Sequence, residues 1–204
     1  MSIKAIINNN TSLKRFVLWM LQPSDEHRPR LWVKLFLNPF KHSRGKNSII
    51  RYRTRLDVFP FNNFQLGPQS VIEDFSTINN GVGDVIIGKK SIIGIGNVII
   101  GPVSIGNNVM LAQNIVISGL NHGFEDISTP PSAQKVVTKD ITISDDVWIG
   151  ANCVVTAGVK IGKHSVIGAG SIVTKDIPDY CVAVGNPAKI IKTYNFESEK
   201  WERV

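Results

Sequence analysis

Four histidines are the side chains of this sequence best suited to move a proton near neutral pH. His27 and His42 lie in a strongly basic N-terminal stretch, and His164 lies inside an aliphatic repeat. His122 stands immediately before a proline-containing loop, residues 123–142, where a scaffold can hold a side chain that still meets a substrate. By placement, His122 is a candidate for general acid–base chemistry, with a structural role as the alternative.

Cysteine and lysine are the other side chains whose spacing bears on chemistry. The two cysteines, Cys153 and Cys181, are too few for a disulfide framework or a metal site. Cys153 also falls at the fifth position of a six-residue repeat, usually a small inward slot, so we interpret it as a core residue and not as a nucleophile. Five lysines of an otherwise acidic region suit a polyanionic ligand or form a solvated surface: Lys160, Lys163, Lys175, Lys189 and Lys192.

The elements that position these residues follow from a period of six. An aliphatic side chain recurs at every sixth position in two runs, and the next position is usually glycine or alanine. The aliphatic positions are Ile87, Ile93, Ile99, Ile105, Leu111, Ile117, Ile143, Ile149, Val155, Ile161, Ile167 and Val173. This period matches neither a helix nor an ordinary strand, but it suits short strands that alternate with tight corners. Three hexads form one triangular coil, so the sequence predicts an all-β solenoid with aliphatic columns in its core.

Two irregularities interrupt the repeat. An earlier aliphatic run, residues 66–78, is offset from the later columns by half a hexad. The interval from Ile117 to Ile143 is several times longer than the single hexad that would join them, so most of the chain between them is extra to the repeat. We expect this insertion, within residues 118–142, to leave the solenoid as an extended loop, with His122 at the last position of the hexad from which it departs.

Motifs in and after the loop are more specific than the repeat. The loop begins with Asn121-His122-x-Phe124-x-Asp126-x-x-x-Pro130-x-x-x-Gln134. Further matches follow at residues 146–151, 167–178 and 185–188. With these motifs, residues 66–192 resemble the left-handed β-helix acyltransferases of the hexapeptide-repeat superfamily, in particular sugar O-acetyltransferases of the maltose, galactoside and colanic-acid types. The resemblance implies a left-handed parallel β-helix, a hand that the period alone does not reveal.

The resemblance also implies roles for individual residues. His122 would be the general base, Glu125 or a backbone carbonyl would orient its second ring nitrogen, and the Gly150 N–H would stabilise the oxyanion. The implied co-substrate is acetyl-CoA, no metal is needed, and three chains would form a homotrimer with active sites between neighbours. Trp148 would border the pantetheine arm, unless it only packs at a corner. The residues implied for CoA are Trp148, Gly150, Ala151, Gly168, Ala169 and Lys175, and those for the acceptor are Asn121, Phe124 and Asp126.

Charge divides the chain into two parts. The 204 residues carry a net charge of +7, but residues 1–55 hold 12 Lys/Arg and two acids, whereas residues 56–204 hold more acids than bases. We interpret residues 1–55 as a basic, partly helical N-terminal cap and residues 56–192 as the solenoid domain. Residues 193–204 are interpreted as a C-terminal tail. The cap could close the open end of the solenoid or contact an anionic membrane. Nucleic-acid binding is disfavoured because no recognition module accompanies the charge.

Local signals predict two helices and a strand within the cap. Residues 11–12, Thr-Ser, can cap a helix that ends near Pro23. A second, very apolar helix is expected at residues 29–37, stopping before Pro39. Arginines alternate with other residues at positions 51–55, which predicts a strand with one basic face.

Together these patterns predict an acetyl-CoA-dependent O-acetyltransferase that acts on a sugar of a surface polysaccharide or its lipid-linked precursor, by direct transfer without an acyl-enzyme. Antibiotic acetylation, N-acetylation of an amino sugar and serine acetylation are alternatives within the superfamily. A zinc hydratase is disfavoured because it needs three histidine ligands and the repeat region supplies two. A non-catalytic solenoid is disfavoured by the His122 motif. No stretch resembles a cleaved leader or a membrane span, so we expect a cytoplasmic location.

Overall fold

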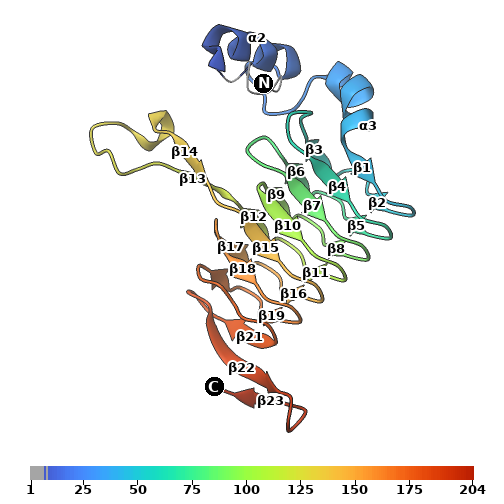
Figure 1. The fold of residues 1–204 in the computed structure, drawn as a ribbon, viewed down its shortest axis with the longest axis vertical. Helices are drawn as coiled ribbons and strands as arrows, with labels where there is room; N and C mark the ends of the chain where they lie inside the picture. Colours follow the sequence, from blue (N-terminus) through green and yellow to red (C-terminus); the bar gives the residue numbers. More distant parts are fainter. Residues whose placement is uncertain (1–6, 8) are drawn as a thin grey trace.

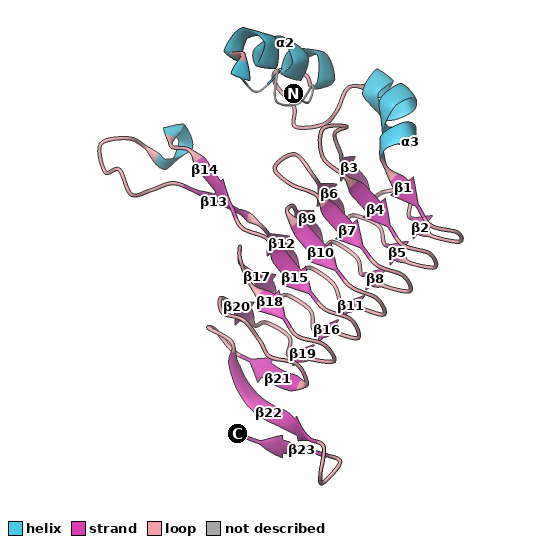
Figure 2. Ribbon diagram, viewed as in Figure 1, coloured by secondary structure: helices cyan, strands magenta, loops and turns pink. Residues whose placement is uncertain are grey.

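The protein is a triangular parallel β-solenoid with helices at its N-terminal end (Figure 1). The computed structural model describes residue 7 and residues 9–204. Three sheets form the three faces of a left-handed prism, and a long hairpin projects from it (Figure 2). The N-terminal helices and the C-terminus lie at opposite ends of the prism. The predicted fold class is therefore confirmed.

Each face is a stack of short parallel strands, because every coil contributes one strand to each face. The first face comprises β1 (Ser43–Arg44), β4 (Phe64–Leu66), β7 (Val85–Ile87), β10 (Val103–Ile105), β15 (Ile141–Ile143) and β18 (Lys160–Ile161). The second face comprises β2 (Ile49–Ile50), β5 (Val71–Ile72), β8 (Ile92–Ile93), β11 (Met110–Leu111), β16 (Trp148–Ile149), β19 (Val166–Ile167), β21 (Cys181–Val184), β22 (Lys189–Asn195) and β23 (Lys200–Arg203). The third face comprises β3 (Arg55–Asp57), β6 (Thr77–Asn79), β9 (Val98–Ile100), β12 (Val116–Ser118), β17 (Val154–Val155) and β20 (Ile172–Val173).

The remaining elements lie outside the coils. Helix α2 (Thr11–Leu21) is followed by a π-helical turn, η1 (Val33–Leu37), which continues into α3 (Asn38–Lys41). The projecting hairpin pairs β13 (Leu120–His122) with β14 (Val136–Thr138), and a 3-10 turn, η2 (Pro131–Ala133), lies between these strands in sequence. None of the described helices is long and apolar enough to cross a membrane.

Strand register confirms the coil length that the repeat predicts. Ile87 pairs with Ile105, which lies three hexads later in the chain. Ile105 then pairs with Ile143, a much more distant position in sequence, because the projecting loop is inserted into that coil. The insertion therefore leaves the prism without disturbing the aliphatic column, as the sequence predicts.

The aliphatic positions point inward and are almost completely shielded from water. They form one continuous core cluster from Val58 to Ala183. Corner glycines let successive coils approach closely: a Cβ added to Gly88 would lie 2.5 Å from the carbonyl oxygen of Gly106. A side chain larger than hydrogen would therefore force those coils apart, which explains why small residues recur beside the aliphatic positions.

The half-hexad offset of the earlier aliphatic run comes from one longer corner. Leu66 pairs with Ile87 and Ile78 pairs with Ile99, so this run belongs to the same columns as the later repeat. These partners are farther apart in sequence than three hexads because residues 80–84 lengthen the corner between β6 and β7. An extra turn at a corner changes the spacing in sequence but not the stacking of the strands.

Four details of the N-terminal part differ from the sequence predictions. Helix α2 is capped by Asn10, whose side chain accepts a hydrogen bond from the Leu13 N–H (3.0 Å), and not by Thr11 or Ser12. The second helical segment does not stop before Pro39, because a proline in the first turn of α3 needs no N–H partner. Residues 51–54 form a corner, not a strand, between β2 and β3. The coils also begin at β1, earlier than residue 56.

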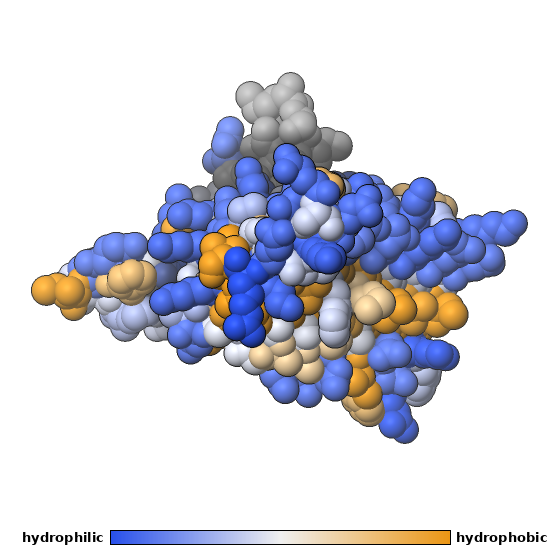
Figure 3. Space-filling view, turned by 90° about the horizontal axis from the view of Figure 1, so that it is seen from below, coloured by the Kyte–Doolittle hydropathy of each residue, from blue (hydrophilic) through white to orange (hydrophobic). Residues whose placement is uncertain are grey.

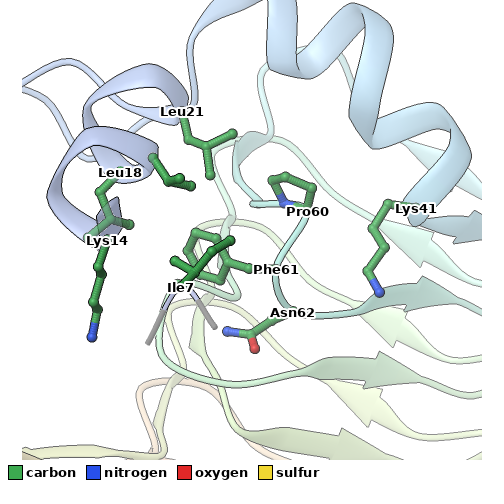
Figure 4. Close-up of a pocket in the computed structure, with 10 residues that line it drawn as sticks. Ile7, Lys14, Leu18, Leu21, Lys41, Pro60, Phe61 and Asn62 are labelled. Atoms are coloured by element: carbon green, nitrogen blue, oxygen red, sulfur yellow. The ribbon is translucent and has the colours of Figure 1, made fainter. Parts of the chain in front are cut away.

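The helices cover the open end of the solenoid through a small apolar cluster. Leu21 and Val33 are buried against Phe59, and Trp32 and Phe61 pack at the edge of this cluster. Beside it, an apolar cavity of about 630 Å³ lies between α2 and residues 60–62 (Figure 4). The inner sides of the helices therefore shield the core residues that would otherwise be exposed at the open N-terminal end, as a solenoid cap must.

Candidate functional site

The loop that carries His122 leaves the prism at the corner between the third and first faces. Its base is the two-stranded hairpin of β13 and β14 (Figure 1). In this hairpin His122 pairs with Val136. Asn121 and His122 are both exposed on β13, whereas Gly123 is buried and its N–H donates to the carbonyl of Lys135 (3.1 Å). The rigid coil and the hairpin ladder thus fix the backbone of His122 and leave its imidazole accessible.

Asp126 organises the loop through hydrogen bonds to its own neighbours. Its carboxylate accepts from the Ser128 N–H (2.9 Å), the Ser128 hydroxyl (2.6 Å) and the Thr129 hydroxyl (2.8 Å). These donors hold the pKa of Asp126 below its ordinary value. The Gln134 amide donates to the backbone carbonyls of Asp126 (2.8 Å) and Thr129 (2.7 Å). Asp126 and Gln134 therefore shape the loop, and Gln134 is a residue whose role the sequence alone did not reveal.

The loop tip is apolar and exposed. Phe124 and Ile127 project into solvent, and Figure 3 shows apolar side chains at the leftmost tip of the molecule, where this loop projects. The Glu125 carboxylate accepts from the Phe124 N–H (2.9 Å), which lowers the pKa of Glu125. Of the two acceptors expected to orient His122, Glu125 is thus turned toward its own backbone.

A second group of predicted residues lies at the corner between the second and third faces. Trp148 lies on β16, half exposed, in register between Met110 and Val166. The small residues that follow these strands, Gly150-Ala151 and Gly168-Ala169, stack on one another, and a Cβ added to Gly150 would lie 2.6 Å from the Ala169 nitrogen. Because these residues have small side chains or none, no large side chain of theirs projects from the outer surface of this corner beside the exposed indole of Trp148.

The Gly150 N–H is engaged in the coil ladder. It donates to the carbonyl of Ile167 at 2.8 Å, and the Gly168 N–H donates to the carbonyl of Ala183 at 2.9 Å. The expectation that Gly150 offers its N–H to an oxyanion therefore needs correction, because that hydrogen already bridges two coils. Another group must therefore donate the hydrogen bond that stabilises the oxyanion.

Geometry separates the two groups within one chain. Lys175, exposed after β20, shares the corner from which the His122 loop departs, since β12, β17 and β20 are neighbours on the third face. Trp148 lies on the second face, and in a triangular prism that face is opposite this corner. One chain thus brings Asn121, His122 and Phe124 together, and separately Trp148 with the small corner residues, but it does not bring the two groups to each other.

A hollow beside Trp148 is a feature that the repeat did not predict. The C-terminal hairpin, β22 and β23, extends the second face by antiparallel pairing and supplies Lys192 and Trp201 to a cavity of about 540 Å³. Trp148 and His164 line its other side. The exposed His164 ring stacks on Tyr180 with centroids 5.7 Å apart. The residues predicted to be a C-terminal tail therefore form part of the surface next to Trp148.

Cys153 lies directly behind this corner, and its replacement by alanine is expected to leave turnover unchanged. The side chain is fully buried, and its thiol donates to the Gly168 carbonyl at 3.1 Å. Burial raises the pKa of this thiol, so at neutral pH it stays protonated and is a poor nucleophile. Steady-state turnover with acetyl-CoA checks this expectation. A covalent acyl adduct on Cys153, or a large loss of kcat in Cys153→Ala with the fold intact, would contradict it.

Metal ligands do not gather in the part of the chain that the structure describes: no group of three or more His, Cys, Asp or Glu side chains lies close enough to hold an ion.

Comparisons of the sequence with protein families and curated proteins match this arrangement. The family described as bacterial transferase hexapeptide (six repeats) matches residues 140–175, and the hexapeptide repeat of succinyl-transferase matches residues 84–118. The chain is 44% identical over 93 residues to a galactoside O-acetyltransferase of Escherichia coli, covering 46% of this chain and 45% of that protein. It is 36% identical over 108 residues to WbbJ of Escherichia coli, named for O-acetyl transfer in lipopolysaccharide biosynthesis, covering 50% and 55%. The matched part thus spans about half of each relative.

Solved structures share most of this architecture. A maltose O-acetyltransferase from Clostridium difficile superposes with a TM-score of 0.54 at 27% identity, covering 92% of this chain and 88% of that one. AntD, an N-acyltransferase from Bacillus cereus solved with dTDP and 3-hydroxybutyryl-CoA, superposes with a TM-score of 0.66 at 22% identity, covering 81% and 90%. The likeness to AntD shows the fold alone.

Proposed function

The chain belongs to the hexapeptide-repeat acyltransferase superfamily, and from this premise we propose that it transfers acetyl from acetyl-CoA to a hydroxyl group of a sugar. The observation that carries the proposal is the exposed imidazole of His122 on a fixed hairpin at the base of an apolar-tipped loop. The similarity to galactoside and maltose O-acetyltransferases supports a sugar hydroxyl as the acceptor. The similarity to WbbJ supports a sugar of a surface polysaccharide or its precursor.

The chemistry needs one base and good positioning. Neutral His122 accepts the proton of the sugar hydroxyl as its oxygen attacks the thioester carbonyl. A C–O bond forms, the C–S bond of acetyl-CoA breaks, and the imidazolium returns the proton to the leaving thiolate. Because both substrates are held together, no acyl-enzyme is required, and the buried thiol of Cys153 has no part in the step.

Acetyl-CoA is proposed to lie along the corner of Trp148, Gly150, Ala151, Gly168 and Ala169. The low surface of this corner lets a narrow pantetheine arm approach the backbone, and the half-exposed Trp148 offers an apolar wall. The phosphates of CoA need a cation, and we propose the exposed side chain of Lys175 for this role. That AntD was solved with an acyl-CoA is consistent with a CoA ligand on this fold.

The acceptor is proposed to lie between Asn121, His122 and Phe124, with Asp126 positioning the loop instead of contacting the sugar. We propose a homotrimer because the loop leaves the corner of the prism that is opposite the face carrying Trp148, so one chain does not bring the two together. Packing prisms side by side would bring the loop of one chain to the corner of its neighbour, so that each site is completed by two chains.

Thiol release from acetyl-CoA against a panel of sugars tests the proposal. The panel pairs each hydroxyl sugar with its amino-sugar counterpart and includes an aminoglycoside antibiotic and serine. We expect release with hydroxyl sugars and a product heavier by one acetyl group that mild alkali removes, as it does an ester. An alkali-stable product would assign N-acylation instead, and absence of release with every acceptor would refute acetyl transfer to these classes.

A further inference from the structure

The N-terminal helices carry more apolar surface than capping the solenoid requires. Their inner sides, with Leu21 and Val33, are buried on Phe59. Their outer sides also carry large apolar side chains, and we call these six residues the outer helical face: Phe16, Trp19, Leu31, Leu35, Phe36 and Phe40. The exposed fraction reaches 71% for Leu31 and 91% for Phe40. Phe16 and Trp19 stack with ring centroids 6.0 Å apart, and so many large exposed apolar side chains on two short helical segments indicate a partner.

Basic side chains surround this face. Arg15 and Lys34 are exposed on the same helical segments, and the guanidinium of Arg30 lies 5.5 Å from the centre of the Trp19 ring. Acidic residues are scarce in residues 1–55, and one of the two, Glu26, is paired with Arg28 at 3.0 Å. The outer helical face is therefore an apolar surface in a strongly positive field.

We infer that the outer helical face docks on an anionic lipid bilayer, with the prism axis pointing away from the membrane. Large aromatic and aliphatic side chains flanked by Arg and Lys are the composition of helices that lie in the headgroup region. Basic residues near such a surface are attracted by anionic lipid, whereas residues 56–204, which hold more acids than bases, are repelled. The helices lie at one end of the prism and the C-terminus at the other, so docking through the helical end leaves the rest of the prism extending away from the membrane (Figure 1).

A bilayer fits this face better than a second copy of the chain. A second copy would place the same strongly basic segment opposite itself, and like charges brought together destabilise an interface. An anionic membrane instead complements the charge and the apolar surface at once. This inference is independent of the proposed acetyl transfer, because its measurement is binding to lipid.

Vesicle flotation of the full-length protein provides the test. Vesicles of phosphatidylcholine alone are compared with vesicles that contain 30 mol% phosphatidylglycerol, at low and at high salt. We expect flotation with the anionic vesicles only, and less of it at high salt. The variant Trp19→Ser/Leu35→Ser/Phe36→Ser and the variant Arg15→Glu/Lys34→Glu are each expected to lower the vesicle partition coefficient by at least about tenfold.

A matched control is available at the other end of the prism. Lys200 and Val204 are exposed near the C-terminus, so Lys200→Glu/Val204→Ser removes comparable chemistry and should float like the unmodified protein. Circular dichroism and light scattering verify the fold and mass of each variant. Binding to neither vesicle type, or equal flotation of all variants, would overturn the inference. So would dissociation of an oligomer by the apolar triple substitution, because another chain would then cover the face.

Discussion

Replacing His122 with alanine is expected to lower kcat for acetyl transfer by about 10²- to 10⁴-fold, the usual contribution of a positioned general base. The fold should survive, because His122 is exposed and its hairpin is held by backbone pairing with Val136 that does not involve the imidazole. The KM for acetyl-CoA should change little, since the corner proposed to bind CoA is built from other residues. Thiol release under saturating substrates measures the effect.

A matched substitution controls for the loss of a histidine as such. His27 is exposed in the N-terminal cap, so His27→Ala should turn over like the unmodified protein. His122→Asn keeps a polar side chain of similar reach but no base, and it should be as slow as His122→Ala. If either His122 variant kept kcat within about twofold, another group would have to be the base.

A large side chain at Ala169 is expected to block acetyl-CoA. Ala169 is exposed at the corner beside Trp148, and its backbone packs closely against Gly150, so a tryptophan there can only point outward into the proposed pantetheine path. We expect Ala169→Trp to raise the KM for acetyl-CoA by at least about 50-fold, because a steric clash excludes the ligand without altering the core. Titration calorimetry with CoA should show the same loss of affinity.

The same corner offers an internal control in another coil. Ile95 follows β8 at the position that Ala169 has after β19, and it is also exposed. Ile95→Trp should fold equally well and keep a KM near that of the unmodified chain, because it lies three coils away along the prism. Similar KM values for Ala169→Trp and the unmodified protein would place the CoA path elsewhere.

The prism was predictable from sequence because its core repeats. Each of the twelve aliphatic positions packs against equivalent positions in neighbouring coils. The same packing requirement therefore recurs many times in the sequence, which makes it detectable. Features that occur once were harder to predict. The corner at residues 80–84 shifts the earlier run by half a hexad, and Pro39 is accommodated in the first turn of α3, where its missing N–H costs nothing.

Within the candidate site, the sequence indicated candidate residues but not what their side chains contact. Asp126 and Glu125 accept hydrogen bonds from their own neighbours, a choice that depends on the local path of the loop. The Gly150 N–H is taken by the coil below it, as the stacking of coils requires. Trp201 reaches the hollow beside Trp148 because the C-terminal hairpin extends the second face. This hairpin lies outside the six-residue repeat, so the repeat could not predict it.

The central claim is that one chain supplies His122 and its neighbour supplies the CoA corner. Co-expression of His122→Ala and Ala169→Trp chains with different tags, followed by purification on both tags, isolates the mixed trimers that this claim requires and tests it directly. In every mixed trimer one site combines an intact loop with an intact corner. At acetyl-CoA near the KM of the unmodified protein, the account predicts about a third of its turnover, whereas each variant alone is nearly inactive. Mixed trimers no more active than the single variants would contradict it, because both parts of the site would then belong to the same chain.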